Sequence, residues 1–446
     1  MRVQRSSVAR FLRSVIGCGL VLSVALLIVV SGPVHWLAGT ADAAGTGKVT
    51  IRYMFWGGQT EIDIVQQLVR EFMEKYPNIE VKLENIPYPE YPTKVPTLLA
   101  SGTAPQVMNI PVQMFHSLAA QGAFQDLGSL AAADRSFDLE EYIPAGRKVF
   151  TANGKLGALP REFGPMMVFY NKQMFDQKGL PYPDPDWTWD TFVQIGKKLT
   201  EDINNDGKID RFAFAGTSWI NHYLPFLWAG GGDIVDSTGK KAVIDQPGAV
   251  KGLQFYVDLM LKYHINPTVQ ELQAGAINTT EWFTTGKIAM YPTFRVGTTV
   301  FLKTKGFEFD VVPFPKGPAG YATLVEPVGL AITADTKGKE LEAAWQFVKW
   351  ATGPEGVRLM TEQNLIVPAI VSVTRSSAFL NPNIPPEHDI YFVQMQPYSH
   401  IVPPIPQWPT LSSIITSEMA PVFAGQAQVS NAVVKMAERI NEVLKK

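Results

Sequence analysis

The sequence predicts an α/β protein with mostly parallel sheets, and three neighbouring patterns lead to this fold class. Residues 48–55 alternate between apolar and polar side chains, which is typical of a strand. Apolar residues then recur at helical spacing between positions 62 and 73, and alternation returns over 79–83. A strand, a helix and a second strand in this order form a βαβ unit, whose two strands run parallel.

The rest of the chain continues this mixture of strands and helices. Apolar runs predict further strands at 166–170, 288–291, 307–312 and 329–333. Helical spacing predicts further helices at 191–199, 249–263, 339–351 and 429–444. Thr188 is placed to cap the first of these helices, with Asp190 in its first turn.

Composition narrows the classes of partner. The 446 residues suffice for two or three domains or for two lobes, and a 46% hydrophobic content suits sizeable cores. Without residues 1–43, which hold four arginines and one acid, 35 basic residues face 40 acidic ones. This mild acidity argues against nucleic acid or anionic lipid as the main partner and leaves neutral small molecules open.

The N-terminal segment predicts export. Four arginines precede an apolar run over about 15–30, and Ala-Asp-Ala at 41–43 offers a cleavage site. We therefore expect residues 1–43 to be a signal peptide and the mature chain to start near Ala44. The alternative is an uncleaved membrane anchor, for which the run is slightly short. Cys18 is the only cysteine, so the cleaved chain would hold no disulfide or cysteine-based metal site.

Four motifs in order along the chain carry a family resemblance. Residues 156–199 place a Gly-Pro turn, an apolar run, YNK, GLP and WTWD in succession. The others are ASGTAPQV at 100–107, FTTGKIAM at 283–290 and LEAAWQFVKWATGPEGVRL at 341–359. Together they resemble the extracellular solute-binding proteins of ABC importers, family 1, in the branch that includes maltose-binding protein.

The resemblance implies a two-lobed fold of the type II periplasmic-binding-protein kind, with hinge crossings between the lobes. The N-terminal lobe would comprise 44–159 plus about 316–360, and the C-terminal lobe 160–315 plus about 361–446. Such a protein captures a mono- or oligosaccharide in the interlobe cleft and delivers it to the membrane permease of an ABC importer. We expect an exported monomer in the periplasm or at the outer face of the membrane, with no cofactor, no nucleic acid and no enzymatic activity.

Two alternatives remain open. The same fold could bind a glycerol-phosphate diester, a peptide or a polyamine. A phosphate site needs converging basic residues, and Arg161 and Arg295 are the only clear candidates near the expected cleft. A secreted glycosidase is the second alternative. Its paired catalytic carboxylates can lie far apart in the chain, so the sequence alone does not exclude it. No H-E-x-x-H, G-x-S-x-G or Walker A motif supports other catalysis.

A sugar site needs flat aromatic surfaces and side chains that donate and accept hydrogen bonds. In the first half of the chain, the candidates follow expected strands or crossings, where ligands gather in α/β sheets. They are Trp56, Gln59, Gln113 and Glu162, with Glu162 expected to accept from a hydroxyl.

The later candidates lie beside expected strand ends, crossings or the LPFLWAGGGD run: Trp219, Asn221, Trp228, Phe294, Arg295, Glu326 and Trp408. Trp228 fits a buried position as well as a ligand platform. Relatives usually have Trp where this chain has Phe294, which weakens the case for a long oligosaccharide. A charge at Glu326 favours polyhydroxyl or cationic ligands over anionic ones.

Residues 202–210, DINNDGKID, look like the opening of a calcium-binding EF-hand loop. Asp202, Asn204, Asp206 and Asp210 supply oxygen donors at the expected spacing. Position 12 of the loop is Ala213 instead of a bidentate Glu, so we expect a polar hairpin turn and not a metal site.

Overall fold

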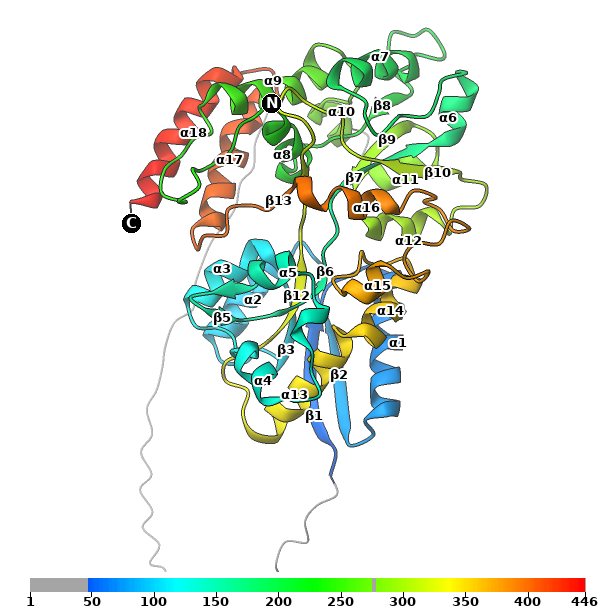
Figure 1. Ribbon diagram of the computed structural model, residues 1–446. Coiled ribbons are helices and arrows are strands. Elements are labelled where there is room, and N and C mark those ends of the chain that lie inside the picture. The colour runs from blue at the N-terminus through cyan, green and yellow to red at the C-terminus, as the bar shows by residue number, and fades with distance from the viewer. Residues whose placement is uncertain (1–46, 275–277, 446) are drawn as a thin grey trace, which may run out of the picture. The chain divides into compact units, whose positions relative to one another are not determined.

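The computed structural model describes residues 47–274 and 278–445, so the expected signal peptide at 1–43 lies outside the described residues. Residues 47–446 form one compact unit that contains two main sheets (Figure 1). Among the residues that the structure describes, no helix is long and apolar enough to cross a membrane. We refer to the two sheets with their helices as the first and second lobes.

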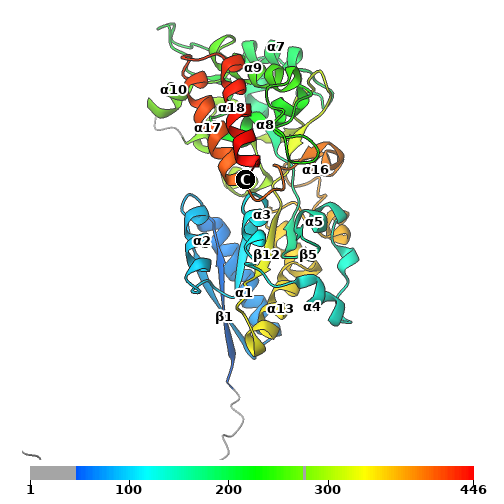
Figure 2. The ribbon, with the colours of Figure 1, turned by 90° about the vertical axis from the view of Figure 1, so that its left-hand side faces the viewer.

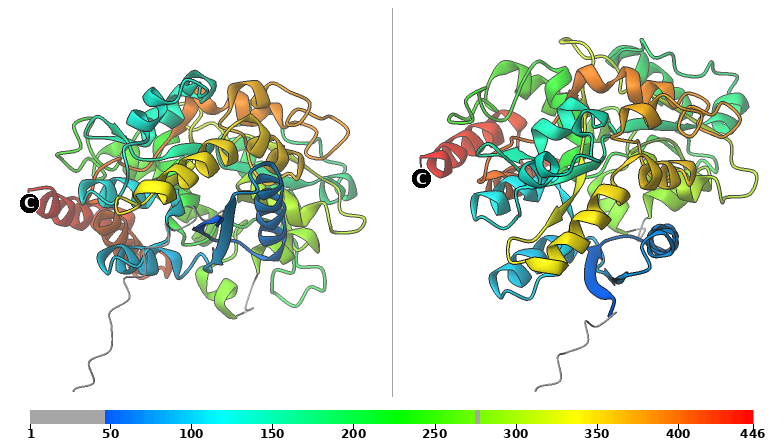
Figure 3. Two further views of the ribbon diagram at one scale, coloured as in Figure 1. Left: turned by 90° about the horizontal axis from the view of Figure 1, so that it is seen from below. Right: turned by 60° about the horizontal axis from the view of Figure 1, so that its bottom comes forward.

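The first lobe is built on a five-stranded sheet. Its strands, in spatial order, are β2 (Ile79–Asn85), β1 (Val49–Phe55), β3 (Val107–Pro111), β12 (Val328–Ile332) and β6 (Leu159–Glu162). The surrounding helices are α1 (Gln59–Lys75), α2 (Tyr91–Ala100), α3 (Val112–Ala120), α4 (Leu127–Ala133), α5 (Pro144–Val149), α13 (Gly338–Ala351), α14 (Pro354–Glu362) and α15 (Val371–Thr374). Helices α1 and α13 contact each other and the strands β2 and β1, so they cover one face of the sheet (Figure 3).

The second lobe is built on a four-stranded sheet. Its strands, in spatial order, are β10 (Phe309–Val312), β7 (Met167–Asn171), β9 (Ile288–Thr293) and β8 (Phe212–Phe214). The surrounding helices are α6 (Lys172–Gln177), α7 (Trp189–Leu199), α8 (Ile220–Ala229), α9 (Pro247–Leu261), α10 (Val269–Ala274), α11 (Thr279–Thr284), α12 (Thr298–Phe301), α16 (Ile390–Gln394), α17 (Trp408–Phe423) and α18 (Val429–Leu444). The last two helices pack side by side (Figure 2).

Short elements complete the described part of the chain. The strands β4 (Thr151–Ala152) and β5 (Lys155–Leu156) form a hairpin, and β11 (Thr323–Leu324) pairs in parallel with β13 (Ser399–His400). Three 3₁₀ turns are η1 (Leu139–Glu141), η2 (Arg295–Gly297) and η3 (Gln396–Tyr398).

Strand direction in both sheets is mostly parallel, as the sequence predicts, with one strand reversed in each. Strand β12 is antiparallel to β3 and β6, and β7 is antiparallel to β9 and β10. The chain enters the first lobe through β12 and the second lobe through β7, coming from the other lobe in each case (Figure 1). An entering strand starts at the cleft, whereas the other strands end there, so it runs against its neighbours.

The predicted strands and helices are present with shifts of at most three residues at their ends. The predicted cap is also confirmed, because the Thr188 hydroxyl accepts a hydrogen bond from the Thr191 N–H at 3.3 Å. Helices α8 and α17 were not predicted, and each contains a proline, which masks helical periodicity.

Two larger hydrophobic cores lie within the lobes. The first core includes Ile51, Phe347 and also Leu365 and Val373, and the second includes Phe226, Phe314 and other residues. The lobe boundaries expected near 315/316 and 360/361 stay predictions, and Leu365 and Val373 pack in the core of the first lobe.

Helices α8 and α9 approach each other unusually closely. A Cβ atom at Gly252 of α9 would lie 2.2 Å from the backbone oxygen of Phe226 and 2.6 Å from the Cα of Leu227, both on α8. Since these are backbone atoms, the contact requires a residue without a side chain. This contact holds α8, which carries one wall of the cleft, against the body of the second lobe.

Candidate functional site

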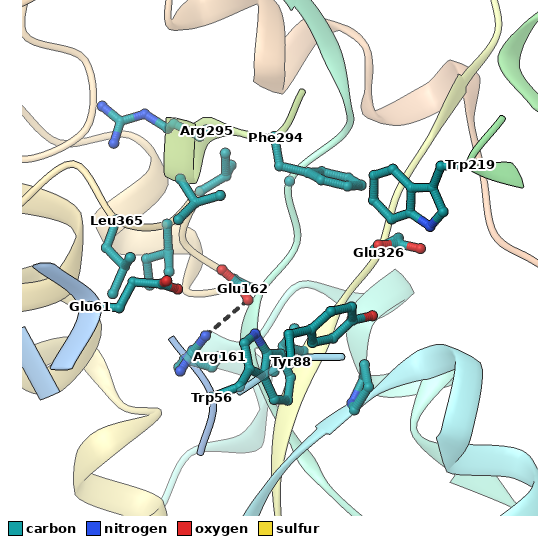
Figure 4. Close-up of a pocket in the computed structure, with 16 residues that line it drawn as sticks. Trp56, Glu61, Tyr88, Arg161, Glu162, Trp219, Phe294, Arg295, Glu326 and Leu365 are labelled. Carbon is teal, nitrogen blue, oxygen red and sulfur yellow. Dashed lines mark hydrogen bonds and ion pairs between the residues drawn. The ribbon is translucent and has the colours of Figure 1, made fainter. Parts of the chain in front are cut away.

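The cleft lies where strands of both sheets end. Strands β1, β3 and β6 of the first lobe end at residues 55, 111 and 162, and β9 of the second lobe ends at 293. The residues that follow or precede these ends line a cavity of about 220 Å³ (Figure 4). Its lining includes Trp56, Glu61, Tyr88, Arg161, Glu162, Trp219, Phe294, Arg295 and Glu326.

A second cavity of about 330 Å³ adjoins the first. Its lining includes Gln113 and Met114 of α3, Asn221 of α8 and Trp408 of α17. The two cavities share four lining residues: Tyr88, Pro111, Trp219 and Glu326. The cavities therefore meet at these residues, and one elongated ligand could occupy both.

Aromatic rings form opposite walls of the first cavity. From the first lobe, Trp56 packs edge-on against Tyr91 at 4.9 Å and against Tyr88 at 5.4 Å. From the second lobe, the rings of Trp219 and Phe294 lie 6.4 Å apart (Figure 4). Trp219 and Tyr88 remain 40% and 39% exposed, which is unusual for such large rings and leaves their surfaces free for a ligand.

Glu326 connects the two lobes. Its Oε1 atom accepts hydrogen bonds from the side-chain amides of Gln113, on α3 of the first lobe, and Asn221, on α8 of the second. Burial raises the pKa of Glu326 to about 7; the two amides lower it, and the charge of Glu162 raises it further. This arrangement holds a carboxyl group between the lobes close to its point of half-ionisation at neutral pH.

Arg161, Glu162 and Glu61 form a charged group at the base of the first cavity. Arg161 donates to Glu162 at 3.0 Å, and Glu61 accepts from the Gly58 N–H at 2.9 Å (Figure 4). Burial raises the pKa of Glu162, and the positive charge of Arg161 opposes this effect. Sequence reasoning missed Glu61, although an acidic residue in the first turn after Gly57-Gly58 was a signal for a carboxylate that accepts from a backbone N–H at the start of α1.

Three polar atoms of the lining residues have no hydrogen-bond partner among the residues that the structure describes. They are Oε1 of Gln113, an acceptor, and two donors, Nε of Arg161 and Nη1 of Arg295, and all three are buried. An unpaired buried polar atom costs about 1–3 kcal/mol. A ligand group that both donates and accepts would relieve that cost.

The structure brings most of the predicted site residues together. Trp56, Glu162, Trp219, Phe294, Arg295 and Glu326 line the first cavity, and Gln113, Asn221 and Trp408 line the second. Gln59 and Trp228 line neither. Gln59, the first residue of α1, is exposed and donates to Asp63 at 2.7 Å. Trp228 is buried, where it stacks on His400 at 4.7 Å and donates to Asp233.

Arg295 lines the cavity, but its guanidinium is directed elsewhere. It forms two hydrogen bonds with Asp389, of 2.6 and 3.0 Å, and a third with Asn364. Both charged side chains are at most 5% exposed. The guanidinium charge is therefore already neutralised within the protein.

The loop at 202–210 is closed by its own hydrogen bonds. Asp202 accepts from the N–H groups of Asp206 and Gly207, and Asp210 accepts from that of Ile203. In the described parts of the chain, no cluster of three or more His, Cys, Asp or Glu residues is arranged to hold a metal ion. These hydrogen bonds from backbone N–H groups to aspartate side chains are typical of the polar turn that the sequence predicts.

The fold and the interlobe cleft define a class of protein, the two-lobed solute-binding proteins. Residues 56–358 match the model of one family within this class, described as bacterial extracellular solute-binding protein. The match covers more than half of the chain, which therefore belongs to this family.

Curated relatives are similar in sequence to this chain over most of their length. A maltotriose-binding protein of Pyrococcus abyssi is 25% identical over 377 residues, which cover 81% of this chain and 74% of the relative. A multiple sugar-binding protein of Streptococcus mutans is 27% identical over 324 residues, which cover 70% of this chain and 73% of the relative.

Solved structures show the same fold. An ABC substrate-binding protein of Listeria monocytogenes in complex with cycloalternan has a TM-score of 0.81 and 23% identity, covering 89% of this chain and 99% of that one. UgpB from Mycobacterium tuberculosis in complex with glycerophosphocholine has a TM-score of 0.76 and 20% identity, covering 90% and 99%.

Proposed function

We propose that this protein binds a carbohydrate in the interlobe cleft and delivers it to the permease of an ABC importer. The observation that carries the proposal is that Gln113, with an unpaired acceptor, and Arg161, with an unpaired donor, line cavities walled by aromatic rings. A sugar hydroxyl both donates and accepts, and the C–H faces of a sugar ring pack on aromatic surfaces. The names of the relatives, which include maltotriose- and multiple sugar-binding proteins, support the same ligand class.

The proposed mechanism is a shift between open and closed arrangements of the lobes. The chain passes between the lobes after β6 and before β12, and these segments would serve as hinges. A ligand that touches Trp56 on one lobe and Trp219 on the other makes its full set of contacts only when the cleft is closed. Binding therefore favours the closed form, and the permease would recognise the surface that closure creates.

Charge in the cleft argues against a phosphodiester ligand. Arg161 is paired with Glu162 and Arg295 with Asp389, so the positive charge of each guanidinium is already compensated within the protein. Glu61 and Glu326 would repel one. We therefore place a neutral or cationic sugar ahead of the glycerol-phosphate alternative.

The test is a binding screen of the mature chain against mono- and oligosaccharides, followed by isothermal titration calorimetry and tryptophan fluorescence. We expect at least one sugar to bind and to raise the melting temperature, because a ligand of the native state stabilises it by mass action. Trp219→Ala should weaken this binding about tenfold, since an aromatic contact is worth roughly 1–1.5 kcal/mol. Trp282→Ala is the matched control, because Trp282 lines neither cavity. If no sugar binds across a broad panel, the proposal is wrong.

A further inference from the structure

The charges around the two cavities do not balance. Five charged residues line them: Glu61, Arg161, Glu162, Arg295 and Glu326. Arg161 is paired with Glu162, and Arg295 with Asp389 behind the wall. In the described part of the chain, the carboxyl groups of Glu61 and Glu326 accept hydrogen bonds from neutral amides and form no ion pair within 4 Å. The cleft thus holds two carboxyl groups whose charge no side chain neutralises.

The ionisation of these carboxyl groups reflects the same imbalance. Burial raises the pKa of Glu61, and the hydrogen bond from Gly58 and the charge of Arg161 offset only part of that effect. Burial raises the pKa of Glu326 to about 7, and the charge of Glu162 raises the pKa of both Glu61 and Glu326. A positive charge from the ligand would oppose these effects and allow both carboxylates to stay ionised when closure removes water.

Aromatic faces surround the place where the cavities meet. Tyr88 from the first lobe and Trp219 from the second line both cavities, as does Glu326 (Figure 4). Burial raises the pKa of the Tyr88 phenol, and the nearby charge of Glu326 raises it further. A carboxylate flanked by two aromatic rings suits an ammonium group, which is attracted by the charge and by the faces of the rings.

We infer that the ligand of this cleft is an amino sugar, or an oligosaccharide that contains one, with its protonated amine beside Glu326. This inference rests on the proposed function, because the hydroxyl groups of the sugar are still needed for Gln113 and Arg161. The amine supplies the positive charge that the cleft lacks. A neutral sugar fits the walls equally well but leaves Glu61 and Glu326 uncompensated in the closed, water-poor site.

The experiment compares sugars that differ only in the amine. Glucose, galactose, mannose and cellobiose are each paired with the counterpart that carries an amino group in place of the 2-hydroxyl, and Kd is measured by calorimetry at about pH 6.5. In the pair that binds best, we expect the amino sugar to bind at least about tenfold tighter, the size of one charge-assisted hydrogen bond.

Variants assign the preference to the carboxylate. Glu326→Gln keeps an oxygen acceptor for Gln113 and Asn221 but removes the charge, and it should reduce the ratio of neutral to amino Kd about tenfold. Glu74→Gln makes the same chemical change at an exposed position of α1 that lines neither cavity, and it should leave the ratio unchanged. Circular dichroism melting checks that each variant folds, and Glu61→Gln replaces Glu326→Gln if the latter does not.

The outcomes separate this inference from the proposed function. If neutral sugars bind as tightly as their amino counterparts or tighter, the inference is overturned and the proposed function stands. The same holds if the preference for the amine persists undiminished in the carboxylate variants. If no sugar of either series binds, the proposed function fails as well.

Discussion

The buried pair of Arg295 and Asp389 supports the sharpest prediction about which residues are structural. Sequence reasoning placed Arg295 among the ligand contacts, whereas the structure directs its guanidinium at Asp389 and over the ring of Phe379 at 4.9 Å. We predict that Arg295→Leu destabilises the fold and alters ligand affinity only as a consequence. Asp389 would then remain buried with no cation beside it.

The expected loss can be worked out from burial and geometry. Breaking a buried ion pair by removing one partner costs about 3–5 kcal/mol, because the remaining charge is left in a poorly solvated site. Asp389 is 4% exposed, and burial already raises its pKa while Arg295 opposes that rise. The contact with Phe379 adds about 0.5–1 kcal/mol. We therefore expect Arg295→Leu to lower the free energy of unfolding by about 3.5–6 kcal/mol.

Urea unfolding followed by both circular dichroism and tryptophan fluorescence measures this loss and shows whether the two lobes unfold together. Asp389→Asn and the double variant Arg295→Leu/Asp389→Asn complete a double-mutant cycle. The double variant should be more stable than the sum of the single effects predicts, because it leaves no buried charge unpaired.

One result would refute this reasoning. If Arg295→Leu changes the free energy of unfolding by less than about 1 kcal/mol and yet weakens sugar binding tenfold or more, then Arg295 is a ligand contact. The original sequence prediction would then be right.

Three further predictions concern stability. The pKa of Glu326 is raised from its ordinary 4.5 to about 7 in the fold, so its contribution to stability falls as pH rises between these values; between pH 5 and pH 7 the melting temperature of the wild type should fall more than that of Glu326→Gln. Gly252→Ala should cost about 3 kcal/mol in urea unfolding, because its Cβ would overlap the backbone of Phe226; a loss below about 1 kcal/mol would contradict that packing. Thr188→Ala should cost about 1 kcal/mol by the loss of one helix cap, and an unchanged melting midpoint would contradict it.

Much of the fold could be predicted because its signals are local. The alternation at 48–55 and the helical spacing at 339–351 reappear as β1 and α13, with boundaries within one residue. Periodicity depends on neighbours a few residues away, and this information is contained in the chain itself. Prolines at 225 and 421 hid α8 and α17, whose helical form depends on packing against other elements.

The candidate site was predicted in part for the same reason. Trp56, Glu162 and Phe294 follow or end strands, and strand ends gather at the cleft in this kind of sheet. Gln59 lies outside both cavities, whereas Glu61, two residues later in α1, lines the first one. The sequence alone does not show which residue at the start of α1 faces the cleft and which faces solvent.

The sequence by itself determined the α/β class, the family and the strand ends that meet at the cleft, because these follow from short periodic patterns and motifs. Only the tertiary structure decided which charges are free. Arg295 meets its partner 94 residues further along the chain, and Glu326 meets Gln113 and Asn221 from opposite lobes. A charge is neutralised by whatever folding brings within a few ångströms of it, and spacing along the chain carries no record of that distance.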